Sequence, residues 1–266
     1  RSSDLADESE YVVESYQISG EPLKPVYLSR VAELEGGYDF SDLAVEGADV
    51  RVERLGEDGS VQEIFAYRES TDSAGVYVSE SSAAVQPLSR YRLVAQLPDQ
   101  NHTIEAETTV PDTFSVLSVT ADTIEYQAGE QLFVRLTRSA YPNRQEVFQF
   151  TSEAAQPWIS RMTPFYRDVA PSDSLEVVRE YRKTSSPLIN GSNYGSETDP
   201  RIEVRVPWLM FAFYGSNEIS THAVDENLYD FLRSQAVQQG GPTTLGPGEI
   251  PSILEHVEGG TGVFGS

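Results

Sequence analysis

Hydrophobic and polar residues alternate in short runs through the first hundred residues. Residues 48–55 (ADVRVERL) alternate strictly, and Gly56-Glu57-Asp58-Gly59 is a hairpin signal before a second run at 61–67. Comparable runs occupy 11–18, 26–31, 75–79, 91–97 and 102–110. Alternation with period two is typical of strands that bury one face. About seven short strands separated by turns predict an immunoglobulin-like β-sandwich over residues 11–111.

Two local features refine this first domain. The segment around Tyr91 (LSRYRL, 88–93) is similar to a tyrosine corner, in which a tyrosine entering a late strand bonds the backbone just upstream; an ordinary strand tyrosine is the alternative. Pro111-Asp112 then interrupts the alternation. Because proline cannot donate to a central ladder, we expect a domain boundary there.

The second half also begins with strand patterns, at 114–120, 131–138 and 146–151, and it returns to them at 201–206. Residues 175–182 are a further candidate strand, and the apolar run 208–214 (WLMFAFY) has the length of a strand or buried core segment. Residues 155–173 and 184–200 are predicted to be long loops. One helix is predicted from Asp225 to about Gln239, because Val224, Leu228, Phe231 and Leu232 have helical spacing.

These patterns predict an all-β protein of two β-sandwich domains. Residues 112–266 would form the second domain, β-rich with long loops and one short helix near its C-terminus. The sequence begins at Arg1 with the polar SSDLADESE, so we expect a mature or trimmed protein whose residues 1–10 are a flexible linker. No run reaches the roughly 18 apolar residues that a membrane-spanning helix needs.

Composition excludes several classes of function. The chain has 266 residues and no cysteine, which excludes thiolate nucleophiles, cysteine-bound zinc and disulfides. Its 42 acidic and 19 basic residues give a net charge of −23, and such an excess repels nucleic acid and anionic lipid. A solvated surface adapted to high salt is one explanation, and an acidic face for cations or a basic partner is the other. The scattered carboxylates favour the first.

The sequence contains no specific catalytic or metal-binding motif. The three histidines are far apart, and His222 with Asp225 and Glu226 lacks the two-histidine spacing of a zinc site. The sequence GSNYG at 191–195 is out of frame for a serine-hydrolase elbow. With 42 acids, some pair of carboxylates always exists, so no pair is a signal. We therefore assign no catalytic residue, no metal and no cofactor.

The glycine-rich ending EHVEGGTGVFGS (255–266) resembles a phosphate-binding loop only in composition. A phosphate loop needs a following helix to supply amide donors, and four residues remain after Gly262. We expect a last strand in which Val263 and Phe264 are buried and the glycines allow close approach or positive φ. Deleting residues 259–266 would then destabilise the second domain.

Aromatic residues in the predicted loops are the candidate binding residues: Trp158, Phe165, Tyr166 and Tyr194. Exposed aromatics on loops of a rigid β scaffold commonly build a contact surface. The alternative is that they pack as a satellite core beneath the long loops.

Several stretches together resemble a family of Bacteroidota cell-envelope lipoproteins, domain-of-unknown-function family 4249. They are YVVESYQISGEPLKPVYLSR (11–30), EGADVRVERL (46–55), TTVPDTF (108–114) and the ending HVEGGTGVFGS (256–266). The ending is similar to the family's Asn-Ile-x-x-Gly-x-Gly-x-Phe-Gly pattern, although His256 stands where the family usually has Asn.

The resemblance implies an outer-membrane lipoprotein, periplasmic or surface-exposed, held by a lipidated cysteine upstream of Arg1. Genes of such proteins often neighbour those of TonB-dependent receptors, which implies an accessory role in uptake or surface assembly. The leading hypothesis is a non-enzymatic accessory lipoprotein that binds such a receptor or a nutrient, whether a small molecule, a glycan or a peptide. A polysaccharide- or peptide-directed hydrolase using carboxylates of residues 155–200 is the alternative, and a structural adhesin is the second.

Overall fold

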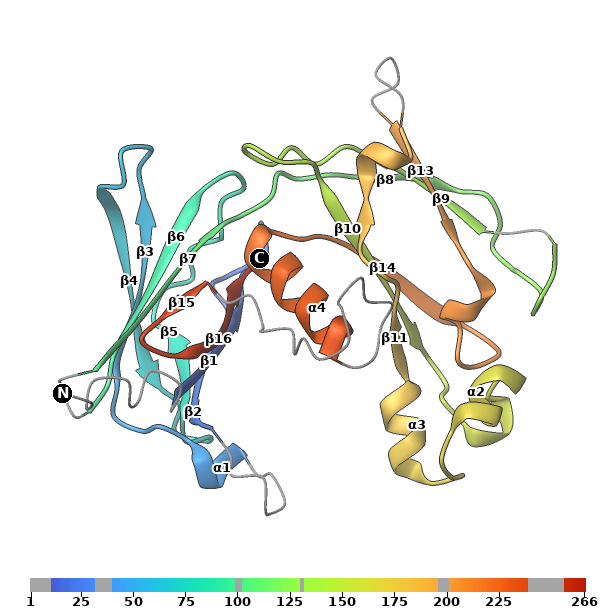
Figure 1. The fold of residues 1–266 in the computed structure, drawn as a ribbon, viewed down its shortest axis with the longest axis horizontal. Coiled ribbons are helices and arrows are strands. Elements are labelled where there is room, and N and C mark those ends of the chain that lie inside the picture. Colours follow the sequence, from blue (N-terminus) through green and yellow to red (C-terminus); the bar gives the residue numbers. More distant parts are fainter. Residues whose placement is uncertain (1–10, 32–39, 99–101, 130–131, 196–200, 239–255) are drawn as a thin grey trace, which may run out of the picture. The chain divides into compact units, whose positions relative to one another are not determined.

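The protein is mostly β and its contacts form two compact units (Figure 1). The computed structural model describes residues 11–31, 40–98, 102–129, 132–195, 201–238 and 256–266, with no side-chain description at 236–238; the predicted linker 1–10 lies outside these ranges. Unit 1 comprises residues 1–112 and 224–266, and unit 2 comprises residues 113–223. The chain therefore returns to unit 1 at Val224, which differs from the predicted second domain of 112–266.

Unit 1 is built on one nine-stranded sheet with the order β15-β7-β6-β3-β4-β5-β2-β1-β16. The elements of unit 1 are β1 (Tyr11–Tyr16), β2 (Val26–Arg30), α1 (Phe40–Leu43), β3 (Asp49–Leu55), β4 (Val61–Glu69), β5 (Val76–Ser79), β6 (Arg90–Gln96), β7 (Thr103–Thr109), α4 (Glu226–Gln238), β15 (Val257–Glu258) and β16 (Thr261–Gly265).

The closing segment, residues 256–266, brings the two ends of this sheet together. Strand β15 pairs antiparallel with β7 at one end, and β16 pairs parallel with β1 at the other. Only Gly259 and Gly260 separate β15 from β16, so the sheet is nearly closed by adjacent residues. Figure 1 shows this red segment between β7 and β1.

The predicted immunoglobulin-like sandwich is therefore not the architecture of unit 1. A sandwich divides its strands between two sheets, whereas here β4 pairs with both β3 and β5 and joins all nine strands into one. Alternation along a strand fixes which face is buried but not which distant strand lies beside it. The same inward faces meet in one core that includes Val13, Leu28 and Phe264.

Local sequence signals in unit 1 were more informative. Gly56 to Ser60 forms the expected turn between β3 and β4, closed by a hydrogen bond from the Gly56 N–H to the Ser60 carbonyl of 2.8 Å. Tyr91 is buried, and its hydroxyl oxygen accepts a hydrogen bond of 2.9 Å from the Gln86 N–H. The predicted bond to the upstream backbone is thus present.

The glycine-rich ending forms the strand that its composition predicts. Val263 and Phe264 are 2% and 0% exposed. Gly262 has φ +114°, and a Cβ there would lie 2.0 Å from the Val13 carbonyl oxygen. Gly259 has φ +72°, and its Cβ would lie 2.1 Å from the Thr103 carbonyl oxygen. The prediction of close backbone approach is confirmed, but the segment belongs to unit 1, so its deletion would destabilise that unit.

Helix α4 is fixed to unit 1 by its first turn. Asp225 is fully buried, and its carboxylate accepts hydrogen bonds from the Leu228 N–H and the Thr108 hydroxyl. The Asn227 side chain donates to the carbonyls of Glu107 and Phe264, at 2.5 and 2.7 Å. The predicted helix is present, and its cap connects it to β7 and β16.

Unit 2 contains two small sheets. One has the order β11-β10-β12 with β14 also paired to β10, and the other has the order β13-β9-β8. The elements of unit 2 are β8 (Val116–Val119), β9 (Leu132–Thr137), β10 (Val147–Ala154), η1 (Ile159–Arg161), α2 (Pro164–Val169), α3 (Leu175–Tyr181), β11 (Lys183–Ser185), β12 (Ile189–Asn190), η2 (Gly191–Asn193), β13 (Arg201–Val206), η3 (Trp208–Met210) and β14 (Asn217–Ala223).

The two sheets share one hydrophobic core, to which Leu136, Phe150 and Val204 belong. A second cluster, including Met162, Val177 and Phe213, lies with the helices of this unit.

Several segments of unit 2 differ from their predicted structure. The predicted loop 184–200 overlaps β11, β12 and η2. Residues 164–169 are helical, with Pro164 at the first position, although this segment was predicted to be loop. Residues 175–181 form α3 and not a strand. The Ser174 hydroxyl caps the helix by accepting a hydrogen bond from the Val177 N–H, and the helix buries Val177 and Val178. The apolar run 208–214 is η3 followed by irregular backbone. The prediction of a single short helix is therefore wrong.

A candidate binding pocket in unit 2

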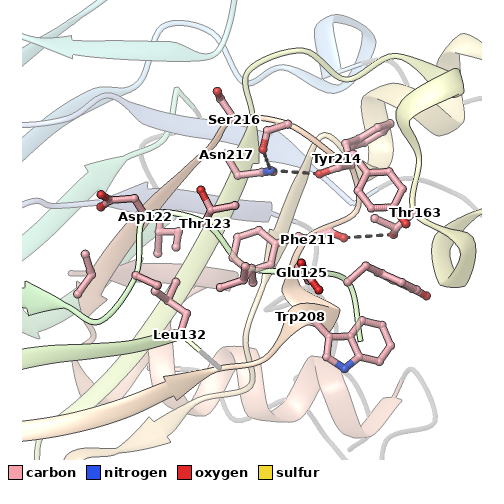
Figure 2. Close-up of a pocket in the computed structure, with 17 residues that line it drawn as sticks. Asp122, Thr123, Glu125, Leu132, Thr163, Trp208, Phe211, Tyr214, Ser216 and Asn217 are labelled. Carbon is pink, nitrogen blue, oxygen red and sulfur yellow. Dashed lines mark hydrogen bonds between the residues drawn. The ribbon is translucent and has the colours of Figure 1, made fainter. Parts of the chain in front are cut away.

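Unit 2 contains an open pocket of about 600 Å³. One wall is the connection between β8 and β9, from Val119 to Tyr126. The other extends from Trp208 of η3 through the following connection to Ile219 in β14. Leu132 and Thr163 complete the lining. Figure 2 shows side chains from both connections directed toward the same space.

An aromatic cluster joins the two walls. The ring of Tyr126 contacts the rings of Trp208 and Tyr214, with centroid distances of 4.8 and 5.9 Å and edge-on geometry. The Tyr126 hydroxyl oxygen also accepts a hydrogen bond of 3.0 Å from the Phe165 N–H. The edge-to-face contacts fix the first wall against the second, and the hydrogen bond fixes the first wall to α2.

The second wall is irregular backbone held by polar side chains. The Asn217 amide donates to the carbonyls of Phe213 and Gly215 at 3.1 and 3.0 Å. The Thr163 hydroxyl lies 3.2 Å from the Phe211 carbonyl (Figure 2). Gly215 has φ +107°, a conformation that favours glycine. These contacts replace the ladder bonds that the predicted strand would have made.

The charges of the pocket have one sign. Asp122 and Glu125 are its charged lining residues, and both are exposed. Within the described ranges no ion pair involves either carboxylate. Both lie on the wall from Val119 to Tyr126, and Glu125 directly precedes Tyr126 of the aromatic cluster (Figure 2). The pocket thus combines aromatic rings with uncompensated negative charge.

The predicted binding residues lie around this pocket or elsewhere in unit 2, and none of the four lines it. Phe165 and Tyr166 lie on α2, and the Phe165 ring is 6.4 Å from the Trp208 ring. Trp158 precedes η1 with 63% of its surface exposed, and Tyr194 follows η2 with 44% exposed.

Of the four predicted binding residues, only Tyr166 packs against a small hydrophobic cluster, which was the alternative to a binding surface. Its ring packs 5.2 Å from the Tyr181 ring, and its hydroxyl donates to the Leu209 carbonyl at 2.9 Å. Burial, together with the neighbouring Tyr181, raises the pKa of Tyr166. Tyr166 therefore supports the structure, whereas Trp158 and Phe165 present surface.

Sequence reasoning missed the pocket residues Tyr126, Trp208, Phe211 and Tyr214. Three of them belong to the run WLMFAFY, whose hydrophobicity indicated a strand. Pro207 before this run and Gly215 after it are the signals of irregular backbone that could have shown otherwise. Tyr126 had no signal of its own, because its partners are distant in sequence.

Comparison with known proteins identifies the family. A family model described as "Domain of unknown function (DUF4249)" matches residues 2–266. The chain belongs to the DUF4249 family. The resemblance seen in the ending and the strand patterns is thereby confirmed.

Other comparisons add little to the DUF4249 assignment. No curated protein matches the chain. Among solved structures, it is similar to trypsin-activated alpha-2-macroglobulin from Escherichia coli, with 11% identity and a TM-score of 0.23. That match covers 81% of this chain and 14% of the other, so the chain spans about a seventh of that protein's length. A likeness this weak carries no argument.

The described part of the DUF4249 chain holds no group of three or more His, Asp or Glu side chains arranged to bind a metal. The His256 ring lies 2.9 Å from the carboxylate of Asp230 on α4. The His102 ring lies against Tyr11, with 5.0 Å between the ring centroids. None of the described helices is long and apolar enough to cross a membrane.

Proposed function

We propose that this DUF4249 protein is a non-enzymatic accessory lipoprotein of the outer membrane that binds a nutrient ligand in the unit 2 pocket, in association with a TonB-dependent receptor. The observation that carries the ligand-binding part is the open, aromatic-lined cavity of about 600 Å³. Sites for small molecules are concave, mostly apolar and roughly 300–1,000 Å³ in volume. The location and the receptor rest on the family alone.

The arrangement of polar groups supports binding over catalysis. Thr163 and Asn217, which line the pocket, are engaged in holding the backbone of the second wall. The described carboxylates of the segment 155–200 are Asp168, Asp173, Glu176 and Glu180, and none is among the lining residues. The pocket therefore gives no support to a hydrolase that acts through these acids.

Affinity capture from native outer membranes tests the receptor part. The full-length lipidated protein should recover an outer-membrane β-barrel of the TonB-dependent class. Recovery of the lipoprotein alone would overturn this part. Self-association on raising salt would favour the structural adhesin instead.

A further inference from the structure

The unit 2 pocket has the chemistry of a site for a positively charged ligand. Its charged lining residues, Asp122 and Glu125, are both acidic, and no described ion pair neutralises them. An anionic ligand would meet two like charges and no basic lining residue. The negative charge of the pocket lining therefore disfavours ligands that carry a carboxylate or phosphate group.

The aromatic residues add a second preference for a cation. Trp208, Tyr126 and Tyr214 form one cluster on the lining, and the faces of such rings attract cations, tryptophan most strongly. Glu125 directly precedes Tyr126 on the same wall, and the Tyr126 ring contacts Trp208, so a carboxylate and the aromatic cluster belong to neighbouring lining residues. A cationic head beside them would contact both kinds of group.

The remaining lining defines the rest of the ligand. Ile124, Leu132 and Ile219 contribute aliphatic surface, and the buried Phe213 also belongs to the lining. A small inorganic cation would leave this apolar surface without a partner. An organic cation would cover it and displace water from it.

We propose that the pocket binds an organic cation with an apolar body, such as an aromatic or aliphatic amine or the end of a basic peptide. This inference rests on the proposed function and names the class of its ligand. Glu125 pairs with the cationic group next to the Tyr126–Trp208 cluster, and Asp122 adds a second negative charge to the lining. The net charge of −23 raises the local concentration of such cations around the whole protein.

Three probes of similar size and different charge test the inference: 2-phenylethylammonium, 2-phenylethanol and phenylacetate. The reporter is a Trp158→Phe variant, in which Trp208 is the remaining tryptophan and lies in the pocket. We expect the ammonium to bind at least about fivefold more tightly than the alcohol, and phenylacetate to bind most weakly. The preference should fall as salt is added.

Matched variants locate the effect. Glu125→Gln should remove most of the preference for the ammonium over the alcohol, and Asp122→Asn should remove less of it. Glu218→Gln is the control, because Glu218 is an exposed acid adjacent to two lining residues but does not line the pocket. Each of these replacements is nearly isosteric and on an exposed side chain, so the fold should persist.

The outcomes separate this inference from the function on which it rests. Equal affinity for ammonium and alcohol, or an equal loss in Glu218→Gln and Glu125→Gln, would overturn the charge preference while leaving the pocket as a binding site. Binding of none of the three probes would overturn both the inference and the ligand-binding part of the proposed function. Preferential binding of the ammonium that depends on Glu125 would support both.

Discussion

Each unit contains a junction between segments that are distant in sequence, and the two junctions are made differently. In unit 1, the closing segment 256–266 meets β1 and β7 through backbone, with glycines where the chains approach. In unit 2, the pocket walls meet through aromatic rings, and the hydroxyl of one of these rings, Tyr126, also bonds α2. A backbone junction leaves no room for a side chain, whereas a side-chain junction can repack. Unit 1 should therefore be the less tolerant of substitution.

Replacing Gly262 with alanine should cause the largest loss of stability. The new Cβ would lie 2.0 Å from the Val13 carbonyl oxygen, and φ +114° is unfavourable for any other residue. We expect the free energy of unfolding of unit 1 to fall by about 3 kcal/mol or more. Far-UV circular dichroism in urea measures it. Both tryptophans lie in unit 2, so the fluorescence midpoint should not move.

Gly20→Ala is the matched control for this substitution. Gly20 also has positive φ, at +80°, but a Cβ there would meet nothing within 4 Å. We expect a loss of about 1 kcal/mol from backbone strain alone. Equal losses at Gly20 and Gly262 would show that close approach is not what makes the closing segment intolerant.

Asp225→Ala should have the next largest effect. It removes the acceptor for the Leu228 N–H and for the buried Thr108 hydroxyl, which connects α4 to β7. A lost cap and the lost hydrogen bond from the Thr108 hydroxyl together should cost about 2 kcal/mol of unit 1 stability, seen by circular dichroism in urea. Glu226→Ala, on an exposed neighbour, should change stability by less than about 0.5 kcal/mol. A comparable loss in that control would count against the capping role.

Tyr126→Phe probes the side-chain junction of unit 2. The aromatic contacts remain and only the hydroxyl that accepts from the Phe165 N–H is lost. We expect about 1 kcal/mol of destabilisation, measured as a shift of the tryptophan fluorescence midpoint in urea. Tyr194→Phe, at an exposed ring in the same unit, should leave the midpoint unchanged. A loss of unfolding free energy in unit 2 larger than the loss that Gly262→Ala causes in unit 1 would reverse the comparison between the junctions.

Added salt should raise the stability of both units, with a smaller contribution from each acidic residue than from any of the substitutions above. Screening reduces the repulsion among the 42 acidic residues, since the Debye length falls to about 3 Å at 1 M salt. We expect the melting temperature to rise between low and molar sodium chloride. A melting temperature that stays constant would show that the acidic surface carries little repulsive energy.

Sequence reasoning succeeded where structure depends on neighbouring residues. The turn at Gly56, the hydrogen bond to Tyr91 and the burial of Val263 and Phe264 all follow from local patterns. The order of the nine strands does not, because alternation leaves the distant partner of each strand undetermined. The pocket could not be predicted for the same reason, because Tyr126 and Trp208 are distant in sequence and come into contact only in the folded unit.

Helices α2 and α3 were missed for a different reason. Both are short, and their hydrophobic spacing covers too few turns to show a period. Pro164 at a first helical position and Ser174 as a cap are the signals that these segments do contain.

The placement of the closing segment has a consequence for how the protein is made. Residues 113–223 leave the ribosome before residues 256–266, so unit 2 can fold while the sheet of unit 1 still lacks β15 and β16. Until then β1 and β7 are open edges, which are templates for pairing with another chain. A chain interrupted before residue 256 therefore keeps a complete unit 2 but carries two aggregation-prone edges in unit 1.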